Sequence, residues 1–312
     1  MKLFIVNPAS GNGRALNHWK QLQLILDQKT VDYQMVLCTD IATTQRTIEE
    51  RIHTLPIDAV VVIGGDGTIN GVVQVLAYLD IPLAVFPSGS GNDICRNFAL
   101  SNEPNAFVEK LLERSIVSVD LLRVNDRYGV TVAGIGLDAK IGARAETSTY
   151  KKWLNHMNKG AFAYTVAACI EFFLYKPFTA TMKIDGVERT ISKLWLLAVG
   201  NCSTYGGGMV ICPDADPTDG FLQLTMLHSA TRQKIITSLF PALLRGKKIV
   251  QEEVSYQSAR QISIDANRIV PIVIDGEVHY SDRYAISIAQ GALQVLLTGN
   301  QKDNLFIKKT LT

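Results

Sequence analysis

The segment Val60–Asn70, Val-Val-Val-Ile-Gly-Gly-Asp-Gly-Thr-Ile-Asn, constrains the fold of this chain more than any other stretch. It begins as a β-branched apolar run, which is typical of a strand buried on both faces. After the glycines, apolar residues recur at helical spacing as far as Ala77. The order strand, glycine turn, helix is that of an open α/β sheet, in which ligands bind at the carboxyl ends of the strands.

The turn itself has the composition of a phosphate site. Gly64, Gly65 and Gly67 carry no Cβ, so backbone can approach a ligand closely, and the helix start offers free N–H groups. Asp66 would repel phosphate unless a cation lay between them, which indicates a Mg²⁺-nucleotide. The alternative is a tight turn in which Asp66 caps a helix; neither a Walker loop nor a Rossmann fingerprint is present.

Strands and helices alternate over the first part of the chain, which predicts a parallel, doubly wound sheet. Turn clusters at 7–13 and 87–93 follow two other predicted strands, so we expect three turns on one rim, forming a nucleotide crevice. The predicted strands are 2–6, 33–38, 60–63 and 82–86.

The pattern changes near Ser118, after which short strands dominate and Asp185-Gly186 signals a hairpin. Antiparallel β structure, most simply a sandwich, follows from this pattern. A length of 312 residues suits two domains. We predict an α/β nucleotide-binding domain over 1–120, to which the tail 299–312 returns, and a β-sandwich substrate domain over 121–298. The predicted strands are 121–124, 128–133, 180–184, 194–199, 221–227, 261–265, 270–274, 284–288 and 293–297.

Helical stretches interrupt the second domain. Residues 137–159 are polar and basic, 161–174 are apolar and aromatic, and the apolar run 235–244 leads into Arg245-Gly246-Lys247-Lys248. A basic flank beside an apolar helix suits an anionic bilayer surface. The alternative is a helix pair packed on the sandwich with a solvated basic edge.

Composition excludes several classes of protein. The chain is 47% hydrophobic and 19% charged, as in a globular protein with a substantial core, and a net charge of +2 argues against a nucleic-acid binder. Five cysteines without a C-x-x-C pair predict neither disulfides nor zinc, and favour the reducing cytoplasm. We expect no spanning helix and no signal peptide, since a strand starts within two residues of Met1.

Taken in order, the motifs resemble those of the bacterial diacylglycerol kinase and lipid kinase family, over nearly the whole chain. That family is related to sphingosine kinases and, more distantly, to NAD kinases. The resemblance implies ATP-dependent phosphorylation of a lipid hydroxyl in a cleft between the domains. The motifs are Asn7–Gly11, Gly64–Thr68, Pro87–Asp93, Gly134–Ala139, Gly206–Met209, Pro213–Asp216 and Asp275–Glu277.

The resemblance also implies the residues that bind cofactors. A structural Mg²⁺ is implied near Asp216, Asp219 and Phe221, where carboxylates and turn carbonyls are suitable oxygen ligands; simple turn formation is the alternative. The nucleotide site is implied to comprise Asn7, Pro8, Ala9, Ser10, Gly11, Thr39, Gly64, Gly65, Asp66, Gly67, Thr68, Asn70, Ser90, Asn92 and Asp93.

Catalytic roles follow from what phosphoryl transfer needs, namely positioning, charge neutralisation and a base. We expect Asp66 to organise the catalytic Mg²⁺, with Asp93 and Asp138 acting through water. Glu277 is the predicted general base, because it follows a strand and a glycine turn at the open end of a sheet. Asp275 is the second candidate for the base, or an orienting residue, and an ordinary hairpin turn is the alternative for both.

Two departures from the family pattern stand out. Ser90 replaces a usual threonine and keeps the hydroxyl. Gly71 stands where family members commonly have glutamate, which predicts lower catalytic efficiency and the same fold.

The predicted acceptor is a lipid such as diacylglycerol, met by a cytoplasmic protein that visits the inner face of the membrane. Exposed strands of the second domain also allow a homodimer. A kinase of a soluble acceptor such as NAD is one alternative. A non-catalytic lipid or nucleotide sensor is another, with Gly71 as its only support.

Overall fold

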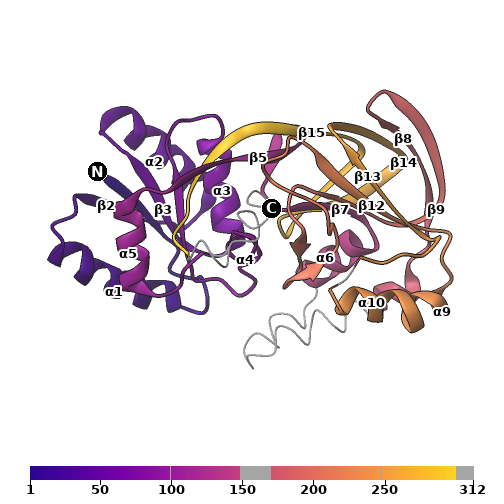
Figure 1. The fold of residues 1–312 in the computed structure, drawn as a ribbon, viewed down its shortest axis with the longest axis horizontal. Helices are drawn as coiled ribbons and strands as arrows, with labels where there is room; N and C mark the ends of the chain where they lie inside the picture. The colour runs from indigo at the N-terminus through magenta and orange to yellow at the C-terminus, as the bar shows by residue number, and fades with distance from the viewer. Residues whose placement is uncertain (99, 148–169, 247, 300–312) are drawn as a thin grey trace, which may run out of the picture.

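The computed structural model describes residues 1–98, 100–147, 170–246 and 248–299. Its N-terminal half is a parallel sheet in the order β2-β1-β3-β4, crossed by helices (Figure 1). The doubly wound half expected from the alternating pattern is therefore present. Its strands are β1 (Lys2–Val6), β2 (Tyr33–Leu37), β3 (Ala59–Gly64) and β4 (Leu83–Pro87), and its helices α1 (Arg14–Gln28), α2 (Ile41–Thr54), α3 (Asp66–Leu76), α4 (Asp93–Asn97) and α5 (Pro104–Glu113).

Alternate residues of the central strands feed two separate cores, as expected for strands buried on both faces. On one face Val60 and Val62 pack with Ile48 of α2 and Ile69 of α3. On the other, Val61 and Ile63 pack in a cluster with residues of α1 and α5. Figure 1 shows the two helix pairs on opposite sides of the sheet.

The C-terminal half is antiparallel and surrounds one large core (Figure 1). β8 and β9 form the hairpin predicted at Asp185-Gly186, with both turn residues at positive φ. Three of the strand predictions differ from the structure. The predicted strands 261–265 and 270–274 are one strand broken by a bulge, and 284–288 and 293–297 also lie in one strand. The single predicted strand 128–133 contributes to two strands. The strands are β5 (Ile116–Val124), β6 (Arg127–Gly129), β7 (Val132–Gly136), β8 (Phe178–Ile184), β9 (Val187–Gly200), β10 (Thr204–Tyr205), β11 (Met209–Val210), β12 (Leu222–His228), β13 (Val254–Ala259), β14 (Gln261–Ile274) and β15 (Glu277–Leu296).

Strand β15 joins the halves. It pairs along its length with β14 and then with β5, and near its end Val295 pairs in parallel with Leu83 of β4. In its last part, Ala289, Leu293 and Val295 belong to the same core as residues of β1 and β3. The predicted division at residue 120 falls inside β5.

The helices of this half are α6 (Leu137–Thr147), α9 (Arg232–Lys234), the π-helical segment η1 (Ile235–Leu239) and α10 (Phe240–Leu244). The predicted helices over 137–159 and 161–174 are only partly covered, since 148–169 lie outside the described residues, as does the predicted returning tail from residue 300. No helix in the described ranges is long and apolar enough to cross a membrane.

Candidate active site

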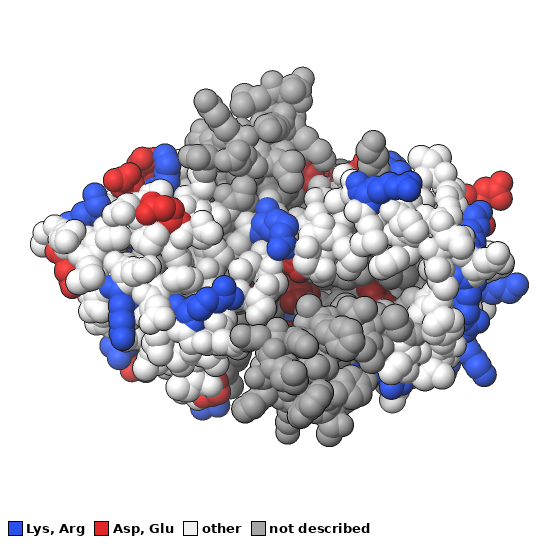
Figure 2. All heavy atoms as spheres, turned by 90° about the horizontal axis from the view of Figure 1, so that it is seen from below, with Lys and Arg blue, Asp and Glu red and all other residues white. Residues whose placement is uncertain are grey.

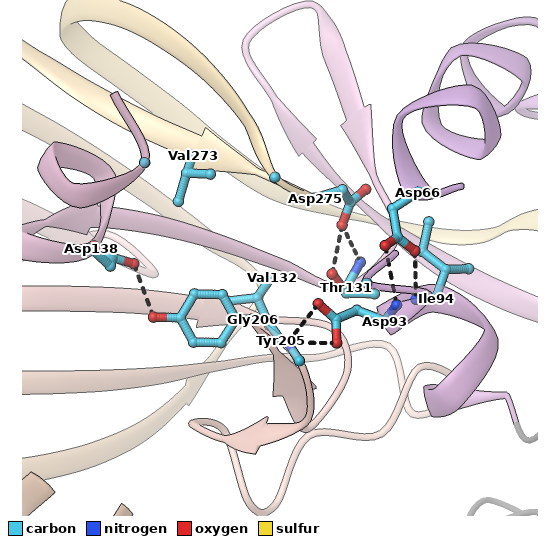
Figure 3. Close-up of a pocket in the computed structure, with 14 residues that line it drawn as sticks. Asp66, Asp93, Ile94, Thr131, Val132, Asp138, Tyr205, Gly206, Val273 and Asp275 are labelled. Carbon is cyan, nitrogen blue, oxygen red and sulfur yellow. Dashed lines mark hydrogen bonds between the residues drawn. The ribbon is translucent and has the colours of Figure 1, made fainter. Parts of the chain in front are cut away.

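A pocket of about 280 Å³ lies where the two halves meet (Figure 3). The N-terminal half contributes the start of α3, the turn after β4 and the first turn of α4. The C-terminal half contributes the β10–β11 hairpin, the start of α6 and the β14–β15 turn. Its carboxylates come from four separate elements, which is why no local motif defines the site: Asp66, Asp93, Asp138 and Asp275.

The glycine turns after β1, β3 and β4 do share one rim, as expected for the carboxyl ends of parallel strands. Asn7 donates from its side chain to Thr68 Oγ1 at 2.7 Å, and its own oxygen accepts the N–H of Ala9. Gly65 and Gly89 approach so closely that a Cβ on Gly89 would lie 2.5 Å from the Cα of Gly65. Glycine is therefore required for these turns to meet.

The remaining residues predicted for the nucleotide site differ in surroundings. Thr39 and Ser90 are exposed at this rim, after β2 and β4. Asn92 bonds to Gly89 through both side-chain atoms and shapes its own turn. Asn70 is buried and donates to Asp275 and to the carbonyl of Tyr128, so it holds the halves together.

Asp66 is half-buried and caps a helix, but not the helix that it begins. Its carboxylate accepts the N–H groups of Asp93 (3.2 Å) and Ile94 (3.1 Å), in the first turn of α4. Burial raises the pKa of Asp66 above its usual value, the two hydrogen bonds oppose this, and the carboxylates of Asp93 and Asp275 raise the pKa further. Asp66 thus fixes α4 relative to α3.

Asp93 reaches across to the other half. Both of its oxygens lie 3.0 Å from the N–H of Gly207, in the β10–β11 hairpin, and its side chain forms an ion pair with Arg96. One turn further along α4, Asn97 exchanges hydrogen bonds with Thr204. The start of α4 is therefore bonded to both halves.

Asp275 is buried and accepts four hydrogen bonds. One oxygen accepts from Asn70 (2.8 Å) and the N–H of Val130 (2.7 Å). The other accepts from the N–H (2.8 Å) and hydroxyl (2.6 Å) of Thr131. These donors occupy the carboxylate, so its position suits an orienting residue better than a proton acceptor.

Glu277 begins β15 and is half-buried. A Cβ placed on Gly67 would lie 3.4 Å from Glu277 Oε1, so this carboxylate faces the start of α3. Asp275 and Glu277 are thus only two positions apart on the hairpin, but the first carboxylate is held by hydrogen bonds and the second faces the glycine turn.

Asp138 lies at the opposite end of the pocket from Asp66 (Figure 3), while Asp93 is beside Asp66. Its carboxylate accepts from the N–H of Ala139 and the hydroxyl of Tyr205. Burial raises its pKa to about 6. A Cβ on Gly134 would lie 1.8 Å from its Oδ2, so glycine is required there.

Asp138 and Tyr205 also border a second cavity of about 380 Å³, which has an almost wholly apolar lining. It lies between β9, β12 and the α9–α10 segment. The carboxylate-bearing pocket and this apolar cavity share Asp138, Tyr205 and Gly206.

The predicted structural metal residues form a tight turn before β12. Asp216 accepts from the N–H and hydroxyl of Thr218, and Asp219 accepts from the N–H of Phe221. Each therefore uses one carboxylate oxygen to close the turn. In the described part of the chain, no group of three His, Cys, Asp or Glu side chains is placed to hold a metal ion, so this Mg²⁺ stays a prediction.

Comparison with known proteins identifies the family. A family model described as "Diacylglycerol kinase catalytic domain" matches residues 2–124, and "YegS C-terminal NAD kinase beta sandwich-like domain" matches residues 131–297. A diacylglycerol kinase of Mycobacterium tuberculosis is 32% identical over 298 residues, covering 94% of this chain and 93% of that protein. The chain belongs to the diacylglycerol kinase family.

The fold agrees with this assignment. A crystal structure of a diacylglycerol kinase from Bacillus anthracis superposes with a TM-score of 0.70 at 21% identity, covering 95% of this chain and 96% of that one. These matches confirm the predicted family and the predicted fold class with its two parts. They also confirm the predicted enzyme class, a lipid kinase and hence a transferase. Kinases of this family imply ATP as the phosphate donor.

Some residues of this diacylglycerol kinase site were not predicted. Thr131, Tyr205 and Arg96 bind the pocket carboxylates. Arg96 has a local signal, since it follows Asp93 by three residues on a helix. Thr131 and Tyr205 have none, because only the tertiary fold brings them to Asp275 and Asp138.

Proposed function

We propose that this diacylglycerol kinase family member transfers the γ-phosphate of ATP to a hydroxyl of a lipid alcohol, such as diacylglycerol, in the pocket between its halves. One observation carries the proposal: the pocket that holds the four carboxylates adjoins an apolar cavity, and the two share Asp138, Tyr205 and Gly206. Reacting groups need the first, and acyl chains fit the second.

The glycine turns would hold the donor. The start of α3 points free backbone N–H groups at the rim, and Gly65 and Gly67 leave room for phosphate. Asp66 and Asp93 stand together at this end of the pocket, and their carboxylates suit Mg²⁺. When bound, the cation neutralises charge on the phosphates.

Glu277 would accept the proton of the lipid hydroxyl, since it faces the start of α3 beside the donor turn. Asp275 would hold Thr131 and Asn70 in place and keep the hairpin that carries Glu277 against α3. Asp138 and Tyr205 border both spaces, so the acceptor would pass them on its way from the apolar cavity to the carboxylate-bearing pocket.

The test is phosphate transfer from γ-labelled ATP with Mg²⁺, comparing the protein with Asp66→Asn. Acceptors are diacylglycerol, phosphatidylglycerol, a sphingoid base and a prenol in mixed micelles, with NAD as the soluble control. We expect a labelled lipid that the variant does not produce. Labelled NAD, or no labelled lipid while ATP still binds, would contradict the proposal.

A further inference from the structure

The helical segment formed by α9, η1 and α10 covers the apolar cavity. Ile235, Leu239 and Leu243 line the cavity, and the first two are buried. These residues follow one another by four positions, so they share one side of the segment. A helix that only closes a cavity in this way would be polar on its other side.

The outer side is apolar as well. Ile236, Phe240 and Leu244, each one residue further along, are 50%, 51% and 62% exposed. We call these three residues the outer stripe. Large apolar side chains gathered on one exposed face mark an interaction surface, whereas scattered ones need no explanation.

Within the chain segment that carries the outer stripe all formal charges are positive, and one of them, Lys234, is paired with Glu253. From Phe221 to Gln251 the sequence contains no Asp or Glu, while Arg232 and Arg245 flank the stripe and are exposed. Arg232 is held in place by a cation–π contact with Trp195 and a 2.7 Å hydrogen bond to the carbonyl of Tyr175. It also donates a hydrogen bond to the backbone carbonyl of Phe173, whose side chain is 65% exposed.

The view of this side of the molecule agrees. Figure 2 looks from below at the side on which α9 and α10 lie in Figure 1. Over the part of the C-terminal half that is not grey, the visible surface is largely uncharged, and its outer edge carries more Lys and Arg than Asp and Glu. An apolar face with a cationic border is complementary to an anionic bilayer surface and not to water.

We propose that the α9–η1–α10 segment docks on an anionic lipid bilayer, with the outer stripe in the headgroup boundary and Arg232 and Arg245 toward the headgroups. The biological use of this docking rests on the proposed lipid acceptor. Phe240 is both exposed and part of the cavity lining. Docking would therefore bring the wall of the acyl cavity to the membrane from which the acceptor comes.

The experiment measures co-flotation with vesicles of phosphatidylcholine and phosphatidylglycerol, and with phosphatidylcholine alone. Ile236→Gln/Leu244→Gln removes two outer-stripe side chains that do not line the cavity. Leu24→Gln/Leu112→Gln, at exposed positions on α1 and α5, is the matched control. We expect the stripe variant to partition onto the vesicles about tenfold less than the wild type, because it has less apolar surface to bury in the bilayer. The control variant should bind like the wild type.

A charge variant tests the cationic border. Arg245→Glu should weaken binding to the anionic vesicles about fivefold or more and change binding to phosphatidylcholine little. Equal thermal midpoints for all variants would show that each is folded. A stripe variant that floats like the wild type would overturn the proposal.

The outcome is separable from the lipid kinase proposal. With a dispersed short-chain diacylglycerol the stripe variant should turn over like the wild type, and with vesicle-borne long-chain acceptor it should lose activity in step with binding. If the wild type binds vesicles through the stripe but phosphorylates no lipid, docking is supported and the proposed acceptor is contradicted.

Discussion

Asp275 and Glu277 stand two residues apart on one hairpin, and their surroundings separate the roles that the sequence left open. Asp275 is occupied by donors from Asn70, Val130 and Thr131. Glu277 faces the glycine turn at Gly67. The local motif could not distinguish them, because every donor to Asp275 comes from more than a hundred residues away in the chain.

Removing the charge of each residue should therefore have different effects. Glu277→Gln should lower turnover about a hundredfold or more, with little change in stability, because a general base typically contributes this much. Asp275→Asn should destabilise the fold by about 3 kcal/mol, since an amide cannot accept all four donors. Steady-state kinetics and urea unfolding would check this. Full turnover in Glu277→Gln would move the base elsewhere.

Gly71 has a packing reason in this chain. A Cβ there would lie 2.8 Å from Ile41 Cγ2, and Gln45 donates to the Gly71 carbonyl, so α2 occupies the space of a side chain. The missing glutamate thus reflects close approach of α2 and α3 as well as any effect on catalysis.

We expect Gly71→Ala to be destabilising in the wild type and stabilising in an Ile41→Ala background, where the higher helix propensity of alanine is no longer offset by a clash. The coupling should be about 1 kcal/mol in a double-mutant cycle of unfolding free energies. Additive effects would show that Ile41 does not explain the glycine.

Asp138 should make stability depend on pH. Burial raises its pKa from 3.8 to about 6, so the folded protein holds this proton more tightly than the unfolded chain. Its stabilising contribution is full below the unfolded pKa and is lost as pH rises through the folded pKa. The free energy of unfolding of Asp138→Asn should lack this loss. The difference in unfolding free energy between the variant and the wild type should therefore shift in favour of the variant by roughly 2–3 kcal/mol from pH 4 to pH 7.5. Urea titrations at the two pH values would test it; a constant difference would contradict it.

At the scale of elements, the turn that precedes β12 is the place to test the predicted structural metal. Asp216 accepts from the N–H and hydroxyl of Thr218, and Asp219 accepts from the N–H of Phe221, each through its Oδ1 atom. Asp120, buried in β5, anchors the same turn by accepting from the N–H of Gly220 at 2.8 Å. These hydrogen bonds hold the turn, and a cation bound by its carboxylates would add to its stability.

If Mg²⁺ binds there, saturating Mg²⁺ should stabilise the chain by about 3 kcal/mol at a hundredfold excess over its dissociation constant. Thermal unfolding with Mg²⁺ or chelator would show a shift for the wild type that Asp216→Ala/Asp219→Ala lacks. An Asp66→Asn control separates this effect from the catalytic pocket. Equal Mg²⁺-dependent shifts of the thermal midpoint in the wild type and both variants would contradict a metal site at Asp216 and Asp219.

The elements were predictable where one local pattern controls them. The β-branched run and glycines at Val60–Gly65 specify strand and turn, and Asp185-Gly186 specifies a hairpin. The two β14 segments were predicted as separate because Ala266–Ile269 breaks the alternation, while the partner strand holds both parts in one ladder across a bulge. A helix cap was the alternative interpretation of Asp66, and only the packing of α4 shows which helix it caps.

At the scale of the whole molecule, the halves are not independent units. The core around β1 and β3 contains Ala289, Leu293 and Val295 of β15, and β5 has β15 as its long partner. The homodimer expected from exposed strands of the second domain stays a prediction.

We expect a fragment of residues 1–124 to be unable to fold alone, although a family model matches almost this range. Without β15 its core has a gap and β5 is unpaired, whereas the whole chain should unfold in one transition. Circular dichroism and calorimetry of both would test this. A fragment with a cooperative transition near that of the whole chain would contradict it.

The path of β15 also orders events during synthesis. β1 to β4 are translated well before the residues that complete their core, Ala289 to Leu297. At about 5–20 residues per second, the nascent nucleotide half must wait roughly ten seconds or more for its closing strand. During that wait one side of β4 lacks its final neighbour, so the growing chain presents an open strand edge on which chaperones can act.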